Sequence, residues 1–365
     1  MNTAGWPAEL PALVDRLLGF LAQDGCSDDD FDAMARDLFA FQYEHDEPYR
    51  RFCQRRGATP RRVAGWRDIP PVPITAFKEA TLTCVPPAGC ERIFMTSGTT
   101  RADVRGRNHH PTIAVWDRSM QRNFRRRFMG ADERMAMVLL FPDERELPNS
   151  SLGRYLTQAG RVFGTEGSRS YVTTQGGLDA DGVCARLEAA QREGEPIAVL
   201  GATFSFVHLL DALPGRRFAL PSGSRLLDTG GYKGQSRELP PEGFYESLSA
   251  AFGVPRERCI NMYGMTELSS QCYDDGNAVV PSVKSGPHWL RTRVVDPLSG
   301  RDVPPGQRGV LAHCDLANFN SATAILTEDV GIAVDGGFLL LGRAQGVEAR
   351  GCSLAVQEFL EAARP

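Results

Sequence analysis

The stretch that decides the fold is RIFMTSGTT, residues 92–100, where a short apolar run leads directly into a loop of serine, threonine and glycine. Small hydroxyl residues let backbone N–H groups and side chains converge on phosphate oxygens, so this loop suits a nucleotide. A cluster of the same composition is also typical of an ordinary turn. The surrounding sequence therefore has to decide between the two interpretations.

Around this stretch, short apolar runs alternate with amphipathic segments. Residues 9–56 repeat apolar positions at intervals of three and four, which predicts α-helices. Farther along, the runs at 135–143 and 196–202 are separated by helical patterns, and from about residue 290 short strands and turns follow. This order predicts an α/β fold with a mixed or parallel sheet and a small β-rich subdomain.

Changes in the pattern divide the chain into four regions. We expect a helical N-terminal region over 1–64, an α/β core over 65–288, a β-rich subdomain over 289–343, and a short C-terminal tail over 344–365 that carries Cys352. We find no internal repeat and no low-complexity segment that would serve as a flexible linker between these regions.

Composition excludes several classes of protein. The 365 residues are 42% hydrophobic and 24% charged with a net charge of −4, and no long basic tract interleaved with aromatics favours nucleic acid. The nine cysteines include no CxxC pair with zinc spacing, which favours reduced thiols. Because no run of about 18 apolar residues occurs, we expect a cytoplasmic protein without a membrane span.

A second motif is NMYGMTELSSQCYD, residues 261–274. Tyr263, Gly264, Thr266 and Glu267 stand at the end of a strand-like run and before a polar segment that reads as the start of a helix. This is the usual place for ligands in open α/β sheets. The carboxylate of Glu267 suits a magnesium ion.

A third motif is TEDVGIAVDGGFLLLGR, residues 327–343. It places Asp329 before a predicted hairpin and Arg343 after it. A carboxylate can accept from two ribose hydroxyls, and a guanidinium can meet a phosphate. Taken separately, Asp329 would be a turn residue and Arg343 a surface cation.

In this order, TSGTT, YGMTE, TEDVGIAVDGG and GR resemble the core motifs of the adenylate-forming (acyl-activating) superfamily. The chain is more closely similar to its short branch, the acyl-protein synthetases of the bacterial luminescence (LuxE) type. That similarity extends to PVPITAFKEATL at 71–82, TGGYKG at 229–234, PHWLRTRVVDP at 287–297 and ARGCSL at 349–354. It spans roughly residues 65–357.

The resemblance implies the large N-terminal domain of adenylate-forming enzymes, with mixed sheets flanked by helices, and a C-terminal domain that is essentially absent. It also implies a role for each motif residue. Ser97, Thr99 and Thr100 would face the triphosphate of ATP, Tyr263 and Gly264 the adenine or acyl plane, Thr266 the AMP phosphate, Glu267 the Mg²⁺, Asp329 the ribose, and Arg343 the ribose and phosphate.

The implied chemistry is attack of a carboxylate on the α-phosphate of ATP, followed by transfer of the acyl group to a thiol. Cys352 lies two residues after Arg350 and thirteen before the end of the sequence, the place where the family carries its acyl group. A nearby cation would favour the thiolate. The alternative is a buried, inert thiol.

Four further residues are candidates for the site. His109, in GRNHHP, would orient the acyl carboxylate or act as a base, or else pair with backbone in a loop. Lys233 would contact a phosphate of ATP or of pantetheine. Phe204 and His288 would line the acyl pocket, whose guest the sequence leaves open between aliphatic and aromatic.

The chain departs from the family pattern at Arg101. The family loop usually runs SGTTG and continues to a lysine, whereas SGTTRADVRGRN has arginines and no lysine. Arg101, Arg105 or Arg107 would replace that lysine as counter-charge to the triphosphate. Alternatively, ATP use has weakened, since a bulky side chain changes how closely the backbone approaches a phosphate.

Three hypotheses follow for the function. The first is an acyl-protein synthetase that uses ATP and Mg²⁺ to activate a carboxylic acid, holds it on Cys352 and passes it to a protein or carrier thiol. The second is an ATP-independent acyltransferase that moves an acyl or aroyl group from a CoA thioester to an acyl-carrier protein through Cys352. The third is a non-catalytic subunit that binds a partner enzyme.

Overall fold

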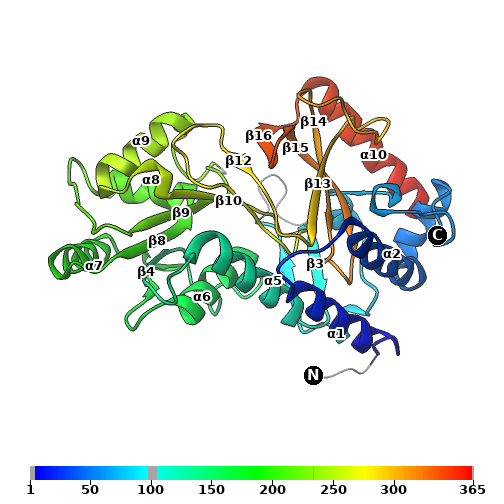
Figure 1. The fold of residues 1–365 in the computed structure, drawn as a ribbon, viewed down its shortest axis with the longest axis horizontal. Coiled ribbons are helices and arrows are strands. Elements are labelled where there is room, and N and C mark those ends of the chain that lie inside the picture. Colours follow the sequence, from blue (N-terminus) through cyan, green and yellow to red (C-terminus); the bar gives the residue numbers. More distant parts are fainter. Residues whose placement is uncertain (1–4, 98–104, 233, 364–365) are drawn as a thin grey trace. The chain divides into compact units, whose positions relative to one another are not determined.

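The structure is a computed structural model that describes residues 5–97, 105–232 and 234–363. The chain forms two compact units, each assembled from segments far apart in the sequence (Figure 1). The first unit comprises residues 1–122, 266–270 and 285–365, and the second comprises 123–265 and 271–284. The segment 65–288, expected as one core, is thus divided between the two units.

The first unit begins with three helices, in the region 9–56 where the sequence predicts helical structure. These are α1 (Leu10–Leu21), α2 (Asp28–His45) and α3 (Glu47–Arg55). Ser27 starts α2 with a capping box, in which its hydroxyl accepts from the backbone N–H of Asp30. Asp46 ends α2 and caps α3 by accepting from the backbone N–H of Tyr49 at 3.1 Å.

The sheet of the first unit contains β13 (Leu290–Val295), β14 (Arg308–Asp315), β15 (Ala324–Val334) and β16 (Gly337–Arg343). These strands pair antiparallel in the order β16-β15-β14-β13. The short strand β1 (Val72–Pro73) pairs parallel with β15, with Val72 opposite Ile325. The β-rich subdomain expected from about residue 290 is this set of strands.

Other elements complete the first unit. The hairpin of β2 (Arg92–Met95) and β3 (Arg107–His110) flanks the hydroxyl-rich loop, and α4 (Ala76–Glu79) follows β1. Helix α5 (Ala114–Phe124) ends where the second unit begins. The C-terminal helix α10 (Gly346–Ala363) packs on α3, with the rings of Phe52 and Phe359 5.0 Å apart.

The second unit is built on a sheet in the order β11-β10-β9-β8-β4-β5. All neighbours are parallel except β11, which is antiparallel to β10. The strands are β4 (Ala136–Leu140), β5 (Arg169–Ser170), β8 (Ile197–Ala202), β9 (Arg225–Thr229), β10 (Cys259–Tyr263) and β11 (Cys272–Tyr273). Strands β4, β8 and β9 are buried throughout, because helices cover both faces.

Helices flank this sheet as the sequence predicts. The main core joins one face of the sheet to α7 (Ala180–Glu193), α8 (Thr203–Ala212) and α9 (Pro241–Phe252). On the other face, α6 (Ser151–Phe163) approaches β4 so closely that a side chain at Gly160 would meet Leu139. A small hairpin of β6 (Val172–Thr173) and β7 (Gly177–Leu178) precedes α7, and β12 (Val283–Lys284) ends the unit.

None of the helices in the described part of the chain has the length and apolar character needed to cross a bilayer.

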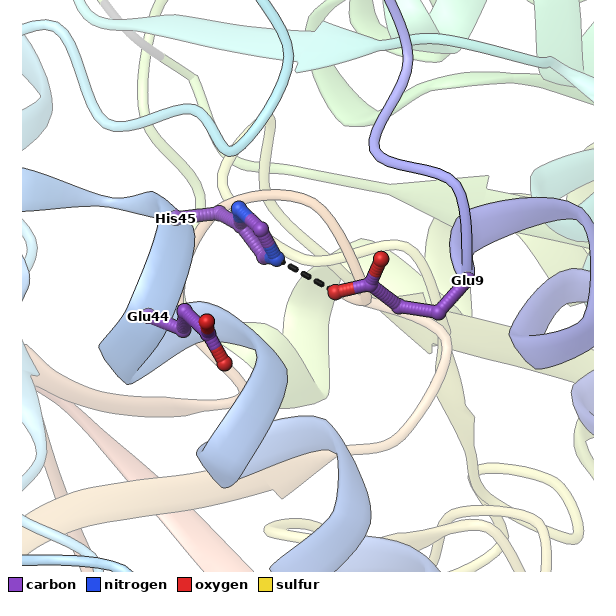
Figure 2. A group of neighbouring side chains, drawn as sticks. All are labelled: Glu9, Glu44 and His45. Atoms are coloured by element: carbon purple, nitrogen blue, oxygen red, sulfur yellow. Dashed lines mark hydrogen bonds and ion pairs between the residues drawn. The ribbon is translucent and has the colours of Figure 1, made fainter.

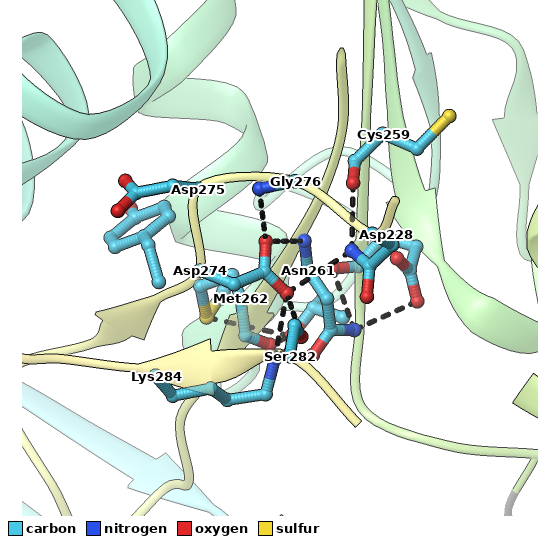
Figure 3. Close-up of polar contacts among 12 residues, drawn as sticks. Asp228, Cys259, Asn261, Met262, Asp274, Asp275, Gly276, Ser282 and Lys284 are labelled. Carbon is cyan, nitrogen blue, oxygen red and sulfur yellow. Dashed lines mark hydrogen bonds and ion pairs between the residues drawn. The ribbon is translucent and has the colours of Figure 1, made fainter. Parts of the chain in front are cut away.

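A buried polar network holds the edge of the second sheet together (Figure 3). The Asp274 carboxylate, directly after β11, accepts from the ammonium of Lys284 at 2.9 Å and the hydroxyl of Ser282 at 2.7 Å. It also accepts from the backbone N–H of Asn261 in β10 at 2.9 Å. Both charged groups are almost fully buried and are therefore out of contact with water. The ion pair between them compensates for the hydration that each charge loses.

We therefore expect Lys284→Met to destabilise the protein by about 3 kcal/mol, since it leaves a buried carboxylate without its counter-charge. The urea midpoint of unfolding measures this loss. The matched control is Arg237→Met, which removes an exposed ion pair with Asp211 and should cost less than about 1 kcal/mol. Equal urea midpoints for the two variants would show that losing the buried ion pair costs no more stability than losing the exposed one.

Candidate nucleotide and acyl site

The segment after β10 carries the second sequence motif. Tyr263 and Gly264 belong to the second unit, and Thr266 and Glu267 to the first. The helix expected here does not form, and residues 264–271 are instead turns and irregular chain. Tertiary contacts take the backbone groups instead, since the N–H groups of Ser269 and Ser270 both donate to Asp315, at 2.9 and 2.8 Å.

Thr266 is held by the β2–β3 hairpin. The side-chain amide of Asn108, on β3, donates to the Thr266 carbonyl oxygen at 3.1 Å. The Glu267 carbonyl accepts from the side-chain amide of Asn318 at 2.6 Å. These two bonds fix the backbone of the Thr266–Glu267 pair within the first unit.

The Glu267 side chain is only 3% exposed and faces Gly106. A Cβ built on Gly106 would lie 3.1 Å from Oε1 of Glu267, so this position needs glycine unless the carboxylate moves. Burial raises the pKa of Glu267 to about 7, Asp329 acts in the same direction, and Lys78 and Arg343 oppose it. A buried carboxyl with an acidic neighbour fits a hard cation such as Mg²⁺, which favours carboxylate oxygens.

Asp329 and Arg343 lie directly opposite each other on β15 and β16. The sequence expectation is therefore corrected: both residues lie inside the two strands of the hairpin, not before and after it. Arg343 donates to Asp329 at 3.2 Å and to Glu328 at 2.5 Å. Asp329 is buried whereas Arg343 is exposed, so the guanidinium reaches the carboxylate from the solvent side.

Cys352 lies on α10 and is 5% exposed. Its sulfur contacts an apolar cluster that includes Val295 and Leu326, and its S–H donates to the Thr327 carbonyl oxygen at 3.8 Å. Burial raises the pKa of this thiol to about 11, Glu328 acts in the same direction, and Arg343 opposes it. The thiol is therefore protonated in this arrangement.

That Arg350 favours the thiolate stays a prediction, and Arg350 is not among the groups that shift the pKa of Cys352 in this arrangement. Arg350 is exposed, and the cation that lowers the pKa of Cys352 is Arg343. Two residues apart on an α-helix, side chains point in different directions, so Arg350 and Cys352 do not share a face. The closeness of Arg350 and Cys352 in the sequence therefore does not bring their side chains together.

Ion pairs hold α10 against the first unit. Arg56 donates to Glu358 at 2.9 Å, and Arg308 lies 3.0 Å from Glu348. Gly351 lies so close to Pro297 that an added Cβ would stand 2.6 Å from the proline Cγ. The helix that carries Cys352 is thus docked, and its sulfur faces inward.

The remaining candidates divide by their surroundings. His109 is 3% exposed, and neither of its ring nitrogens has a hydrogen-bond partner among the residues the structure describes. Burial lowers the pKa of His109, with a contribution from Arg107, so the imidazole is neutral near pH 7. Such an unpaired buried imidazole calls for an explanation.

His288 and Phe204 have less specific surroundings. A ring nitrogen of His288 lies 3.1 Å from the carbonyl oxygen of Phe20, and its ring packs on the Phe20 ring. These contacts with α1 account for His288 without an acyl group. Phe204 is half-buried on α8, near His208. Ser97 is exposed at the start of the hydroxyl-rich loop, whereas Thr99, Thr100 and Lys233 lie outside the described residues.

Sequence reasoning missed Lys78. Its side chain lies beside Gly106 and Glu267, although the three residues are far apart in the chain. The available signal was its position in PVPITAFKEATL, a motif of the resemblance to which no role was attached.

Glu9, Glu44 and His45 form a separate group of possible metal ligands (Figure 2). Their ligand atoms lie within 4.8 Å of one another, but both carboxylates are exposed. Glu9 and His45 pair at 2.6 Å, which joins the start of α1 to the end of α2. This contact explains the group as a link between helices.

Comparison with known proteins places this geometry in context. The model of the family "Acyl-protein synthetase, LuxE" matches residues 26–361. Long-chain-fatty-acid–luciferin-component ligases of Vibrio harveyi and Aliivibrio fischeri are each 24% identical over 313 residues, which cover 82% of this chain and 78% of theirs.

Solved structures agree on the fold. The structure of 2-hydroxyisobutyryl-CoA ligase in the postadenylation state, in complex with 2-HIB-AMP, has a TM-score of 0.62 and 16% identity, covering 87% of this chain and 67% of that one. ATP-bound MatB from Rhodopseudomonas palustris has a TM-score of 0.51 and 17% identity, covering 69% and 47%. The expected fold of adenylate-forming enzymes is confirmed.

Proposed function

Because the chain belongs to the LuxE family of acyl-protein synthetases and is an acyl-activating enzyme, we propose that it converts a carboxylic acid to its adenylate, holds the acyl group on Cys352 and delivers it to a protein or carrier thiol. The names of the two relatives make long-chain fatty acids the first substrates to test. ATP and Mg²⁺ are the proposed cosubstrate and metal.

One observation carries the proposal. The Cys352 sulfur contacts the Thr327 carbonyl oxygen, and the Thr327 hydroxyl accepts from the backbone N–H of Asp329 at 3.0 Å. The candidate nucleophile is thus docked on the same strand as the candidate ribose ligand, two residues away. A thiol that accepts an acyl group from an adenylate needs such proximity to the nucleotide.

In the proposed first step, a carboxylate oxygen of the acid attacks the α-phosphorus of ATP, the bond to the bridging oxygen breaks, and pyrophosphate leaves. Thr266 would bind the AMP phosphate and Asp329 the ribose, while Tyr263 and Gly264 would contact the adenine or acyl plane. Glu267 would hold Mg²⁺, which when bound neutralises phosphate charge. Ser97, Thr99 and Thr100 keep their proposed role at the triphosphate, and Arg343 at the ribose and phosphate.

In the proposed second step, the Cys352 sulfur attacks the acyl carbonyl carbon, and AMP leaves. The thiol must first lose its proton, which its buried position opposes. Leaving the apolar cluster would return its pKa toward the ordinary value of about 8.5. We propose His109 as the residue that orients the acyl carboxylate or accepts a proton, because its buried ring nitrogens lack partners in the described chain.

A second candidate function rests on the loop after Ser97. Arginine at 101 and the lack of a lysine in SGTTRADVRGRN favour an enzyme that takes its acyl group from a CoA thioester without ATP. Cys352 would play the same part in both reactions, so the two differ only in the donor.

An ATP–pyrophosphate exchange assay with a panel of fatty and aromatic acids tests the proposal. We expect exchange that requires both an acid and Mg²⁺, strongest for long-chain acids. No exchange with any acid, together with labelling of Cys352 by acyl-CoA in mass spectrometry, would reject the adenylation step and favour the second candidate.

A further inference from the structure

We propose that Lys78 contacts the β- and γ-phosphates of ATP and the leaving pyrophosphate. Lys78 would thus replace the lysine that the hydroxyl-rich loop does not contain. This inference rests on the proposed adenylation reaction. It assigns a phosphate-binding role to a residue outside the loop, on a different element of the first unit.

The backbone of Lys78 has a fixed position. Lys78 lies on α4, which directly follows β1, and β1 pairs in parallel with β15. The N–H of Ile74, between β1 and α4, donates to the Leu326 carbonyl oxygen at 2.9 Å. Lys78 is therefore attached to the strand that carries Asp329, the proposed ribose ligand.

The Lys78 side chain extends toward the base of the hydroxyl-rich loop. Its Cγ lies 3.6 Å from the point where a Cβ on Gly106 would stand, and the same point is 3.1 Å from both Thr96 Cγ2 and Glu267 Oε1. Thr96 and Gly106 bracket the loop and bond to each other twice, each time at 3.0 Å. Lys78 and the proposed metal ligand thus meet where the loop begins and ends.

The charges in this cluster leave Lys78 available. Arg343 is already bonded to Asp329 and Glu328. In the described ranges, by contrast, Lys78 takes part in no hydrogen bond or ion pair that would occupy its three ammonium donors. A half-buried, uncommitted ammonium beside an acidic metal ligand suits a ligand that is itself anionic.

The chemistry of the step explains the need for this cation. As the carboxylate oxygen bonds to the α-phosphorus, the bond to the bridging oxygen breaks and negative charge moves onto the departing pyrophosphate. A fixed ammonium near that charge stabilises it more in the transition state than in the ground state. Of the other candidates for this charge, Arg105 and Arg107 are both exposed, whereas Lys78 is half-buried, and Arg101 lies outside the described residues.

Lys78→Met tests the assignment, with Lys78→Arg as the conservative variant and Arg61→Met as the matched loss of an exposed cation of the first unit. For Lys78→Met we expect kcat/KM for ATP, and kcat/KM for pyrophosphate in the reverse reaction, to fall at least about tenfold. Acylation of Cys352 from synthetic acyl-AMP should stay within about twofold, because no pyrophosphate is involved. Lys78→Arg should recover most of the loss, and Arg61→Met should resemble the wild type.

Three outcomes would overturn the assignment. The first is unchanged kcat/KM for ATP and for pyrophosphate in Lys78→Met. The second is an equal loss in the acyl-AMP reaction, which would mean that Lys78 only supports Glu267 or the fold. The third is a loss in Arg61→Met that equals the loss in Lys78→Met, which would mean that the effect is not specific to Lys78. A wild-type enzyme that shows no exchange with any acid would instead refute the proposed function, so the two failures are distinguishable.

Discussion

Cys352→Ala is expected to abolish the acyl-enzyme, with transfer to an acceptor thiol falling at least about a thousandfold while acyl-AMP formation stays within about threefold. The alanine methyl group fits the apolar cluster that now surrounds the sulfur, so α10 should remain docked. Intact-protein mass spectrometry after incubation with acid and ATP measures the thioester, and pyrophosphate exchange measures activation.

The matched control for this variant is Cys314→Ala. Cys314 is also a buried cysteine of the first unit, on β14, and burial raises the pKa of its thiol well above the ordinary range. Its loss should leave both half-reactions intact. A thioester that persists in Cys352→Ala, or one that disappears in Cys314→Ala, would show that the acyl group is carried elsewhere.

Glu267→Gln is expected to lower pyrophosphate exchange by about two to three orders of magnitude, because the amide keeps the shape of the carboxylate but not its charge for Mg²⁺. The wild type should also lose exchange as the pH falls below about 7, where Glu267 becomes protonated, whereas the variant should lack this dependence. Initial rates between pH 5.5 and 8.5 at saturating acid would provide the comparison.

Glu267→Gln should lower pyrophosphate exchange without lowering the stability of the protein at high pH. Because the folded-state pKa of Glu267 is raised above its unfolded value, its stabilising contribution is complete below the unfolded pKa and is lost as the pH rises through about 7. At pH 8 the variant should therefore be at least as stable as the wild type. Glu79→Gln, an exposed change on α4, is the control expected to alter neither property, and equal effects of the two substitutions would contradict a metal-binding role for Glu267.

The fold was predictable because its signals are local and ordered. The apolar runs of β4 and β8, the helical spacing of residues 9–56 and the order of the motifs all survive in the structure. The helix expected after Tyr263 was wrong because Asp315 binds the backbone N–H groups of Ser269 and Ser270, a tertiary effect that outweighs local propensity.

Parts of the candidate site could not be derived from spacing along the chain. The pKa of Cys352 is high because α10 packs on the sheet of the first unit and buries the thiol. The residues next to Cys352 in the sequence do not predict this burial. Lys78 meets Glu267 only because the pairing of β1 with β15 brings α4 to the same place. Both effects depend on contacts between segments that are far apart in the sequence.

Strand β15 gives these residues a common frame of reference. Ile325 pairs with β1 and so positions α4, Thr327 meets the sulfur of α10, and Asp329 faces Arg343. Between Leu326 and Val330 the pairing of β15 with β14 contains a register shift, so Thr327 and Asp329 lie in an irregular part of the strand. A shift of one residue in the pairing of β15 would turn the side chains of Thr327 and Asp329 to the opposite face of the sheet. A movement of the strand as a rigid body would instead move Lys78, the Asp329 carboxylate and the Cys352 thiol together. The spacing among these groups is therefore encoded in the register of a single strand, which makes it insensitive to changes in the loops around it.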